Sequence, residues 1–268
     1  MTFNLMAAQE LGQKWYQTFY DEVVQSLRFS KSQDEFSRNV LSLLLRLKSN
    51  LVFPDSEKTS QVGIVFGAGP SLVDDVRDLK KFIYKNKPVL IAADGAADGI
   101  YATCKLHANF IVSDLDSCSP SMLEEQSRFR HLFIHSHGNN LENILKIVPG
   151  LGNNLTGTTQ IEPLENVANI GGLTDGDRAC FLAAALNLKT VIIAGMSFGT
   201  EEGSFSKNRS NQKFDFSRWL RKLEFGKKSL EFLVRNSPSM TFINVTKNGV
   251  PISGARQMTT YELNREIS

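Results

Sequence analysis

Asn109-Phe110-Ile111-Val112-Ser113-Asp114-Leu115-Asp116 is an apolar run that ends in two aspartates one residue apart. The apolar part predicts a buried β-strand. In an open α/β sheet, such a strand delivers polar groups to the crevice at the carboxyl edge. On an extended segment, Asp114 and Asp116 would point the same way, with Leu115 turned away. Such a pair suits Mg²⁺, which binds one or two carboxylates together with substrate phosphates. The alternative is a solvated Asp/Ser turn.

The composition indicates an ordinary soluble globular protein. The 268 residues are 41% hydrophobic and 22% charged, which suits one large domain or a domain with an appendage. A net charge of +2 gives no reason to expect nucleic acid or a membrane as partner. No apolar run approaches the roughly 20 residues of a membrane span, and the N-terminus lacks a signal-peptide pattern. With 3 scattered cysteines, we expect a reducing, cytoplasmic location.

Residues 1–55 differ from the rest of the chain in their pattern of apolar residues. They contain few helix breakers and repeat apolar residues at every fourth position, which predicts two or three amphipathic helices ending near Phe53-Pro54-Asp55. The apolar faces comprise Leu11, Trp15, Phe19 and Val23, then Phe36, Val40, Leu44 and Leu47. We expect a helical cap over residues 1–55, without chemistry of its own, and a Rossmann-like catalytic domain over residues 56–268. The apolar stripe would cover the sheet or pair with a second subunit.

From Val62 onward, apolar strand-like runs alternate with helical segments. Strands are expected at residues 62–66, 89–93, 110–112, 132–134, 190–194 and 240–245. Helices are expected after Ser71 and over residues 97–105, 142–148, 174–186 and 216–236. Residues 150–162 predict a loop with at most a short strand. The alternation predicts an α/β fold with a mostly parallel, Rossmann-like sheet flanked by helices.

Small or polar residues follow five of these strands. The groups are Gly67-Ala68-Gly69, Asp94-Gly95, Asp114 with Asp116, His135 with His137, and Gly195-Met196-Ser197. Because the carboxyl ends of parallel strands meet at one edge, we expect these groups to converge. This convergence is a more specific sign of a functional site than any single motif.

The turn Gly67-Ala68-Gly69-Pro70-Ser71 joins a strand to a helix. Its glycines let backbone N–H groups approach a phosphate, and Ser71 can cap the helix. The turn lacks the Lys-Ser/Thr of a Walker A loop and the third glycine of the dinucleotide fingerprint. A plain tight turn is the alternative.

Two further strand ends offer candidate ligands. In Asp94-Gly95-Ala96, the carboxylate could reach a metal or a ribose hydroxyl, or cap the next helix. His135 and His137 could donate a proton or a hydrogen bond to a phosphate, or have a structural role. His-x-His without a third soft ligand is a poor zinc signal.

The stretch from Gly171-Gly172 through Thr174, Asp175 and Arg178 opens an alanine-rich helix. Thr174 as N-cap and Asp177 as its capping-box partner explain part of it. The backbone N–H groups could bind a phosphate, Asp175 could be a third metal carboxylate, and Arg178 could neutralise negative charge.

A long polar loop over residues 199–213 follows the strand at 190–194. Its cations Lys207, Arg209 and Lys213 could close over phosphates as a lid. A solvated loop is the alternative.

Five motifs, in this order, resemble the archaeal 6-hydroxymethyl-7,8-dihydropterin pyrophosphokinases of the MptE type, which are distant relatives of thiamin pyrophosphokinase. The motifs occupy residues 66–72, 93–96, 112–117, 135–139 and 171–178. The resemblance covers about residues 45–255, most of the chain.

The resemblance implies transfer of diphosphate from ATP to the hydroxymethyl group of a reduced pterin, with Mg²⁺ required and AMP released, for tetrahydrofolate or methanopterin biosynthesis. Asp114 and Asp116 would hold Mg²⁺, with Asp94 and Asp175 as further ligands. The turns at Gly67–Ser71, Asp94–Ala96 and Gly171–Thr174 would line the nucleotide. Arg178, His135 and His137 would act at the phosphates. Ser113 stands where thiamin pyrophosphokinase has glycine, so detailed roles do not transfer from that relative.

Two other functions remain open. Glycosyltransferase-like proteins linked to flagellin modification share the Gly-Ala-Gly-Pro-Ser-Leu type of loop, and Asp-x-Asp also suits a nucleotide-sugar transferase. Those proteins are usually much longer, so a chain of 268 residues favours the pyrophosphokinase. The other alternative is a non-catalytic nucleotide-binding protein. The expected partners are ATP and a reduced hydroxymethylpterin, without nucleic acid or membrane.

Overall fold

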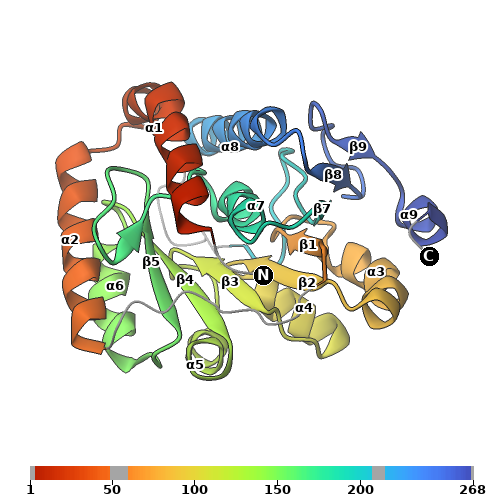
Figure 1. Ribbon diagram of the computed structural model, residues 1–268, viewed down its shortest axis with the longest axis horizontal. Coiled ribbons are helices and arrows are strands. Elements are labelled where there is room, and N and C mark those ends of the chain that lie inside the picture. The colour runs from red at the N-terminus through yellow and green to blue at the C-terminus, as the bar shows by residue number, and fades with distance from the viewer. Residues whose placement is uncertain (1–3, 49–59, 207–214, 267–268) are drawn as a thin grey trace.

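The structure is a computed structural model that describes residues 4–48, 60–206 and 215–266. Within these ranges the strands form one nine-stranded sheet, in the order β6-β5-β4-β3-β2-β1-β7-β8-β9 (Figure 1). All pairings between these strands are parallel. The strands are β1 (Val62–Phe66), β2 (Val89–Ala93), β3 (Phe110–Ser113), β4 (His131–Ser136), β5 (Leu155–Thr159), β6 (Val167–Ala168), β7 (Thr190–Ala194), β8 (Thr241–Asn244) and β9 (Arg256–Gln257).

Helices flank the sheet, which confirms the predicted α/β, Rossmann-like class. The described helices are α1 (Leu5–Leu27), α2 (Lys31–Lys48), α3 (Leu72–Asn86), α4 (Ala96–Cys104), α5 (Pro120–Phe129), α6 (Leu141–Ile147), the 3₁₀ turn η1 (Val148–Gly150), α7 (Asp175–Ala185), α8 (Phe216–Asn236) and α9 (Thr260–Glu266). The bounds of β1, β2, β7 and α8 agree with the ranges expected from the sequence.

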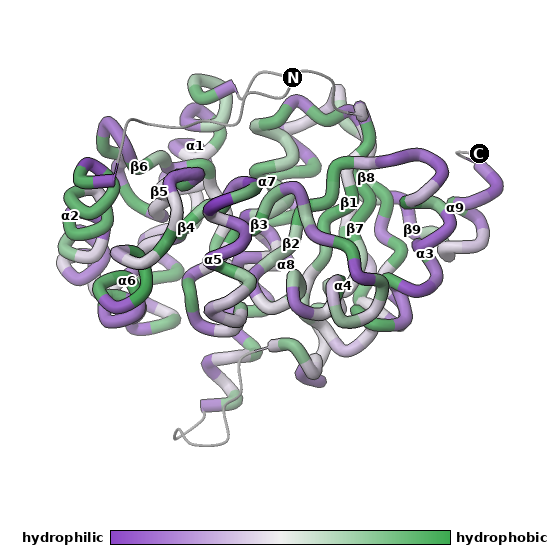
Figure 2. Tube along the Cα trace, turned by 90° about the horizontal axis from the view of Figure 1, so that it is seen from below, coloured by the Kyte–Doolittle hydropathy of each residue, from purple (hydrophilic) through white to green (hydrophobic). Residues whose placement is uncertain are grey.

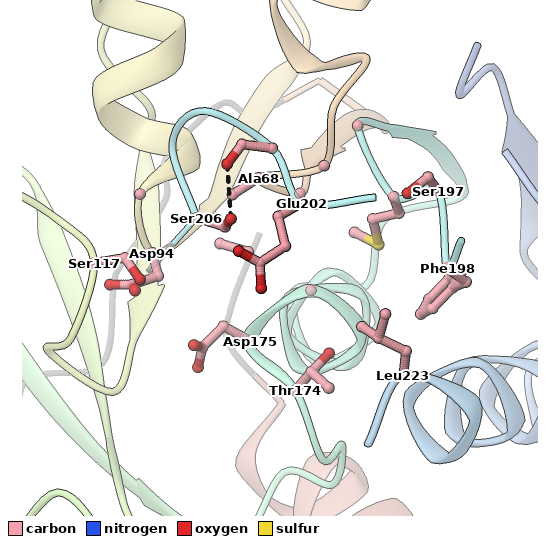
Figure 3. A pocket seen from close by; sticks show the side chains of 18 of the residues that line it. Ala68, Asp94, Ser117, Thr174, Asp175, Ser197, Phe198, Glu202, Ser206 and Leu223 are labelled. Atoms are coloured by element: carbon pink, nitrogen blue, oxygen red, sulfur yellow. Dashed lines mark hydrogen bonds between the residues drawn. The ribbon is translucent and has the colours of Figure 1, made fainter. Parts of the chain in front are cut away.

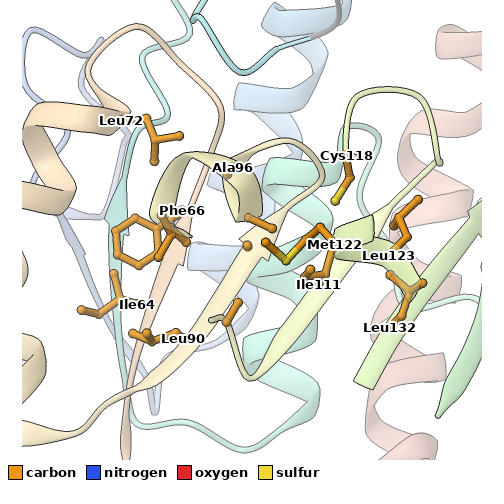
Figure 4. Close-up of a cluster of buried hydrophobic side chains, with 14 of the residues drawn as sticks. Ile64, Phe66, Leu72, Leu90, Ala96, Ile111, Cys118, Met122, Leu123 and Leu132 are labelled. Carbon is orange, nitrogen blue, oxygen red and sulfur yellow. The ribbon is translucent and has the colours of Figure 1, made fainter. Parts of the chain in front are cut away.

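Both faces of the central strands are buried, as is usual for a parallel sheet. Successive strand residues point to opposite faces. Ile64 and Phe66 therefore pack in the cluster that includes α3, α4 and α5 residues (Figure 4), whereas Val65 packs with α1, α7 and α8. Figure 2 shows the result: apolar strands in the middle and more hydrophilic helices such as α3 and α9 at the periphery. None of the described helices has the length and apolar character that crossing a bilayer requires.

The direction of strand addition reverses at β1. After β1 the chain adds β2 to β6 on one side, and then crosses back to add β7, β8 and β9 on the other. Such a reversal leaves a crevice at the carboxyl ends of the two neighbouring strands. The loops after β1 and β7 meet there, since Gly67 N donates to Ala194 O at 2.9 Å and Gly69 N donates to Gly195 O at 2.8 Å.

The sequence did not predict β6, β9, α5 or α9, and it indicated at most a short strand where β5 lies. The β5 sequence is Leu-Thr-Gly-Thr-Thr, which lacks an apolar run. All five residues are nevertheless buried. Thr158 shows why this is stable, because its hydroxyl donates to Ile134 O at 3.2 Å and the buried polar group is thereby satisfied.

The two N-terminal helices pack on different parts of the domain. Helix α1 lies against α7 and α8, and α2 lies against β5 and α6 (Figure 1). Trp15 and Val23 are buried on α1, as the apolar stripe predicts. The division of the chain at residue 55 stays a prediction, and the predicted helix end at residues 53–55 lies outside the described residues.

The predicted apolar face of α2 was wrong only at its two ends, since Val40 and Leu44 are partly buried and pack against the core. Phe36 is 59% exposed and Leu47 is 77% exposed. The buried face is partly polar instead and comprises Asp34, Ser37, Leu41, Ser42 and Leu45. The polar members have partners, which offsets the cost of burying them; Ser42 Oγ, for example, donates to Asn166 Oδ1 at 2.6 Å.

Candidate active site

A cavity lies over the carboxyl ends of β1, β2, β3 and β7, where the strand order reverses (Figure 3). We call it the glycine pocket, because the turns after β1, β2 and β7 contribute Gly67, Gly69, Gly95 and Gly195. Asp94 and Asp175 lie toward one end of it, and Phe198 and Leu223 lie at the other (Figure 3). Other lining residues expected from the sequence are Ala68, Asp114, Asp116 and Thr174.

The glycines of the turn after β1 allow this turn to lie very close to the loop after β7. A Cβ on Gly69 would lie 2.5 Å from Gly195 O, and one on Gly67 would lie 2.8 Å from the same oxygen. Any larger residue would force the loops apart. Ser71 is the N-cap residue of α3, as predicted, but its hydroxyl makes no capping hydrogen bond and donates to Asp75 Oδ2 at 2.9 Å instead. Pro70 and Ser71 line a separate hollow on the outside of this turn.

Three carboxylates converge beside the glycine pocket. Asp94 follows β2, Asp114 follows β3 and Asp175 begins α7, and one oxygen of each lies within 4.8 Å of the others. Asp116 lines the pocket further along. The extended Asp-x-Asp geometry expected from the sequence was wrong, because Leu115 has a left-handed φ of 67° that turns the chain. Leu115 itself is turned away into the core, as predicted.

Burial and mutual repulsion dominate the electrostatics of this cluster. Burial, followed by the charges of Asp114 and Asp116, raises the pKa of Asp94 to about 8. Burial and the same kind of repulsion raise the pKa of Asp175. Burial also opposes ionisation of Asp114, but the hydrogen bond and charge of His137, together with Lys222, hold the pKa of Asp114 below its usual range.

The cluster fits a hard divalent cation. Three carboxylates supply the oxygen donors that Mg²⁺ prefers, and their repulsion would be relieved by a positive ion. Asp114 Oδ1 is buried and has no hydrogen-bond partner among the described residues, so it has an unused acceptor. Asp94 is held in place by Ser113 Oγ and by Cys118 N, which donates at 3.2 Å. The helix-capping role considered for Asp94 was wrong, because Gly95 is the N-cap of α4.

The loop before α7 is shaped to present Asp175. Asp177 accepts from Leu173 N and Thr174 N, each at 2.7 Å, which confirms the predicted capping box. Gly171 and Gly172 adopt φ values of 89° and 87°, which favour glycine. They line neither this cavity nor the next one, and a Cβ on Gly172 would lie 2.6 Å from Arg178 Cα.

A second, smaller cavity adjoins the first at Asp114, Asp175 and Lys222. We call it the histidine pocket, because His135 and His137 line it. Arg178 lines it too and is 1% exposed; its Nη1 lies 3.3 Å from Asp175 Oδ1, and its Nη2 donates to Gly172 O at 2.9 Å. The structure therefore divides most of the predicted site residues between two pockets, while Ala96, the first residue of α4, is buried and lines neither.

Several lining residues were not predicted from the sequence. They are Phe198, Trp219 and Leu223 in the glycine pocket, Phe29 and Gln160 in the histidine pocket, and Lys222 in both. Phe198 directly follows the Gly195-Met196-Ser197 group, which could have indicated it, whereas the α8 residues, Phe29 and Gln160 belong to no local motif.

Part of the long polar loop packs over the glycine pocket. A Cβ on Gly203 would lie 2.0 Å from Ala68 O, and one on Gly95 would lie 2.0 Å from Phe205 O, so backbone contacts backbone here. The loop residues Glu201, Glu202 and Ser206 also line the pocket. The cations expected in a lid, Lys207, Arg209 and Lys213, lie outside the described residues.

Among solved structures, a glycosyltransferase described as MAf, from Magnetospirillum magneticum AMB-1, has a similar fold. The TM-score is 0.53 at 14% sequence identity, and the match covers 85% of this chain and 38% of that chain. At this identity the likeness concerns the fold alone.

Three curated archaeal proteins are similar in sequence, each named 6-hydroxymethyl-7,8-dihydropterin pyrophosphokinase. The one from Methanocaldococcus jannaschii is 34% identical, over 83% of this chain and 96% of its own. Those from Methanothermobacter thermautotrophicus and Pyrococcus furiosus are 35% and 33% identical, over 81% and 83% of this chain and 93% and 95% of their own. A family model described as 6-hydroxymethylpterin diphosphokinase MptE-like matches residues 36–203. The chain belongs to this MptE-like 6-hydroxymethylpterin diphosphokinase family.

Proposed function

We propose that this chain transfers the terminal diphosphate of ATP to the hydroxymethyl group of 6-hydroxymethyl-7,8-dihydropterin, releases AMP, and requires Mg²⁺. The family membership supports the pterin diphosphokinase activity. The product would serve tetrahydrofolate or methanopterin biosynthesis.

The observation that carries the proposal is the position of the carboxylate cluster at the junction of two pockets. Transfer of a diphosphoryl group between two substrates requires that both meet at one place and that the phosphate charge is neutralised there. The glycine pocket suits ATP, since its apolar end with Phe198 and Leu223 fits an adenine and its other end carries Asp94 and Asp175 (Figure 3). The triphosphate would then reach the junction.

The bond changes follow from this orientation. The hydroxymethyl oxygen attacks the β-phosphorus of ATP, a new oxygen–phosphorus bond forms, and the bond from the α,β-bridging oxygen to the β-phosphorus breaks. AMP leaves with the bridging oxygen, and the hydroxyl proton passes to solvent. Transfer of this kind depends chiefly on positioning and on neutralising charge.

Residues at the junction would supply both effects. When bound, Mg²⁺ would neutralise the phosphate oxygens and align them for in-line attack. Asp94, Asp114 and Asp175 would hold the ion, with Asp116 near the phosphates. Lys222 lines both pockets and would bring a positive charge to the transferred group.

An AMP-release assay tests the proposal. The protein is incubated with ATP and Mg²⁺ and one acceptor at a time: the reduced hydroxymethylpterin, thiamin or a sugar. Of the three acceptors, we expect only the pterin to give AMP. We expect AMP formation to cease when EDTA removes the metal. Folded protein that binds ATP but gives no pterin-dependent AMP would contradict the proposal and indicate a nucleotide-binding protein without this activity.

A further inference from the structure

The histidine pocket has a wall built by the N-terminal helices. Phe29, in the turn between α1 and α2, lines it together with His135, Asn139, Gln160 and Arg178. We propose that this pocket binds the planar ring of the reduced pterin, and that the α1–α2 hairpin is part of the active site. The inference rests on the proposed function and goes beyond it by assigning the acceptor's position and a role for residues that carry no sequence motif.

Unsatisfied buried groups in the pocket point to a polar ligand. His135 is 1% exposed, and its Nδ1 lies 3.2 Å from Thr158 Oγ1 while its Nε2 makes no hydrogen bond within the described part of the chain. Arg178 Nε is likewise buried without a partner there. Such atoms are rare in folded proteins and are stabilised when a ligand supplies the missing partner. A pterin carries an amino group, a ring N–H and a carbonyl along one edge, so it offers both donors and acceptors.

Phe29 supplies a flat apolar surface beside these polar groups. Helix α1 ends because Arg28 adopts a left-handed φ of 52°, and Phe29 follows directly. Arg218 lies over its ring, with 5.5 Å between the guanidinium carbon and the centroid, which helps to fix the ring. Aromatic side chains bind planar heterocycles by stacking.

Asp34 connects the hairpin to the pocket. This buried carboxylate on α2 accepts from Tyr20 Oη at 2.8 Å, from Gln160 Nε2 at 2.8 Å and from Gly138 N at 2.7 Å. It thereby orients the Gln160 amide in the pocket and holds the turn that follows His137. Asp34 is a positioning residue, since it lines neither pocket itself.

The mixed charge of the pocket favours a neutral ring over a second phosphate. The cations Arg178 and Lys222 are matched by Asp114 and Asp175 at the junction. The histidine pocket also lacks a glycine turn among its described lining residues. A pterin placed here would direct its hydroxymethyl group to the carboxylate cluster, where the β-phosphorus of ATP is expected.

Two matched aromatic substitutions test the assignment. Phe29→Ala removes the proposed pterin-stacking surface, and Phe198→Ala removes an aromatic ring from the glycine pocket. Michaelis constants are measured for both substrates by AMP release. For Phe29→Ala we expect the KM for pterin to rise about tenfold and the KM for ATP to stay within about twofold. Phe198→Ala should give the reverse, and Phe29→Tyr should restore pterin binding.

Asp34→Asn tests the contribution of the hairpin. The amide has one acceptor oxygen in place of two, so it can no longer hold both Gln160 and the turn at Gly138. We expect the KM for pterin to rise about tenfold, with the KM for ATP within about twofold. A general loss of stability would change both constants or lower the amount of active enzyme instead, which active-site titration detects.

The outcomes separate the two proposals. If wild-type protein makes no AMP with the pterin, the proposed function fails. If the wild type is active but Phe29→Ala and Asp34→Asn alter the KM for ATP and leave that for pterin unchanged, the function stands and the pterin site is overturned. A variant that fails to fold is replaced by Phe29→Leu, which keeps the apolar volume and removes the aromatic face.

Discussion

The glycine pocket and the histidine pocket share a junction but are built differently. The first is lined largely by consecutive residues of turns that follow neighbouring strands, as in Gly67-Ala68-Gly69. The second is lined by single side chains from the α1–α2 turn, β4, the segment after β5, and α7. The backbone of a turn can bind a group common to many ligands, such as phosphate, whereas side chains discriminate between rings. The comparison suggests that the pockets separate general nucleotide binding from acceptor specificity.

The largest effect is expected at Asp114, a member of the carboxylate cluster that lines both pockets. Asp114→Asn should lower kcat for AMP release about a thousandfold, because one ligand of the metal and its charge are lost. Asp116→Asn, in the glycine pocket alone, should lower kcat about tenfold. Circular dichroism confirms the fold of both variants. Equal losses would show that the Asp-x-Asp pair acts as a unit and that the junction has no special role.

Lys222 gives the next largest effect. Lys222→Met keeps the length of the side chain and removes its charge from both pockets, so kcat should fall about a hundredfold with small changes in either KM. Its exposed neighbour on α8 provides the control, Arg221→Met. We expect near wild-type turnover for that control. Similar losses in both variants would indicate a general effect of charge on α8.

A smaller effect should be confined to the glycine pocket. Gly203→Ala places a methyl group where Ala68 O lies 2.0 Å away, so the loop must move off the turn. We expect the KM for ATP to rise about tenfold, with the KM for pterin nearly unchanged. Gly199→Ala is the matched control, since its nearest contact would be Ser197 Oγ at 4.0 Å. A parallel rise in both constants would refute the separation of the pockets.

The smallest expected effect concerns stability at the junction. Burial raises the pKa of Asp94 to about 8, so between about pH 4 and pH 8 the folded state holds a proton that the unfolded state has released. The free energy of unfolding of the wild type therefore falls as pH rises through this window. Asp94→Asn avoids that loss and should be more stable than the wild type at pH 8 in EDTA, with no gain at pH 4.

Denaturant unfolding with and without Mg²⁺ checks this expectation. Added Mg²⁺ should stabilise the wild type more than Asp94→Asn, because the variant lacks one ligand. Asp74→Asn, at a half-exposed carboxylate outside both pockets, serves as control and should shift stability by less than about 0.5 kcal/mol. A wild type that gains stability between pH 4 and pH 8 relative to Asp94→Asn would contradict the electrostatic account.

Most of the sheet could be predicted from the sequence, because its central strands are continuous apolar runs. β1, β2 and β7 follow this pattern closely. β5 does not follow this pattern. Its sequence is rich in threonine and resembles that of a loop, although its threonines are buried. The face of α2 was misjudged for a related reason, since Asp34 and Ser42 are buried through partners on distant elements.

The residues of the candidate site likewise separate into those that a local sequence pattern predicts and those that depend on distant elements. Asp94, Asp114 and Asp175 could be predicted because each follows or precedes a recognisable element in the chain. Their mutual distances depend on the left-handed turn at Leu115, which the alternation of a strand does not anticipate. Phe29 and Gln160 could not be found, because each needs the tertiary fold to bring it to the junction.

The attachment of α1 has a consequence for the order of assembly. Trp15 Nε1 donates to Ser229 Oγ at 2.8 Å across a sequence separation of 214 residues, and Asn4 N donates to Ala185 O at 2.9 Å. During synthesis the N-terminal helices leave the ribosome first, long before α8 exists. Trp15 therefore cannot make this hydrogen bond until residue 229 has been added to the chain. The first residues to be made are among the last to reach their native positions, and the wall of the histidine pocket that they form is completed late in folding.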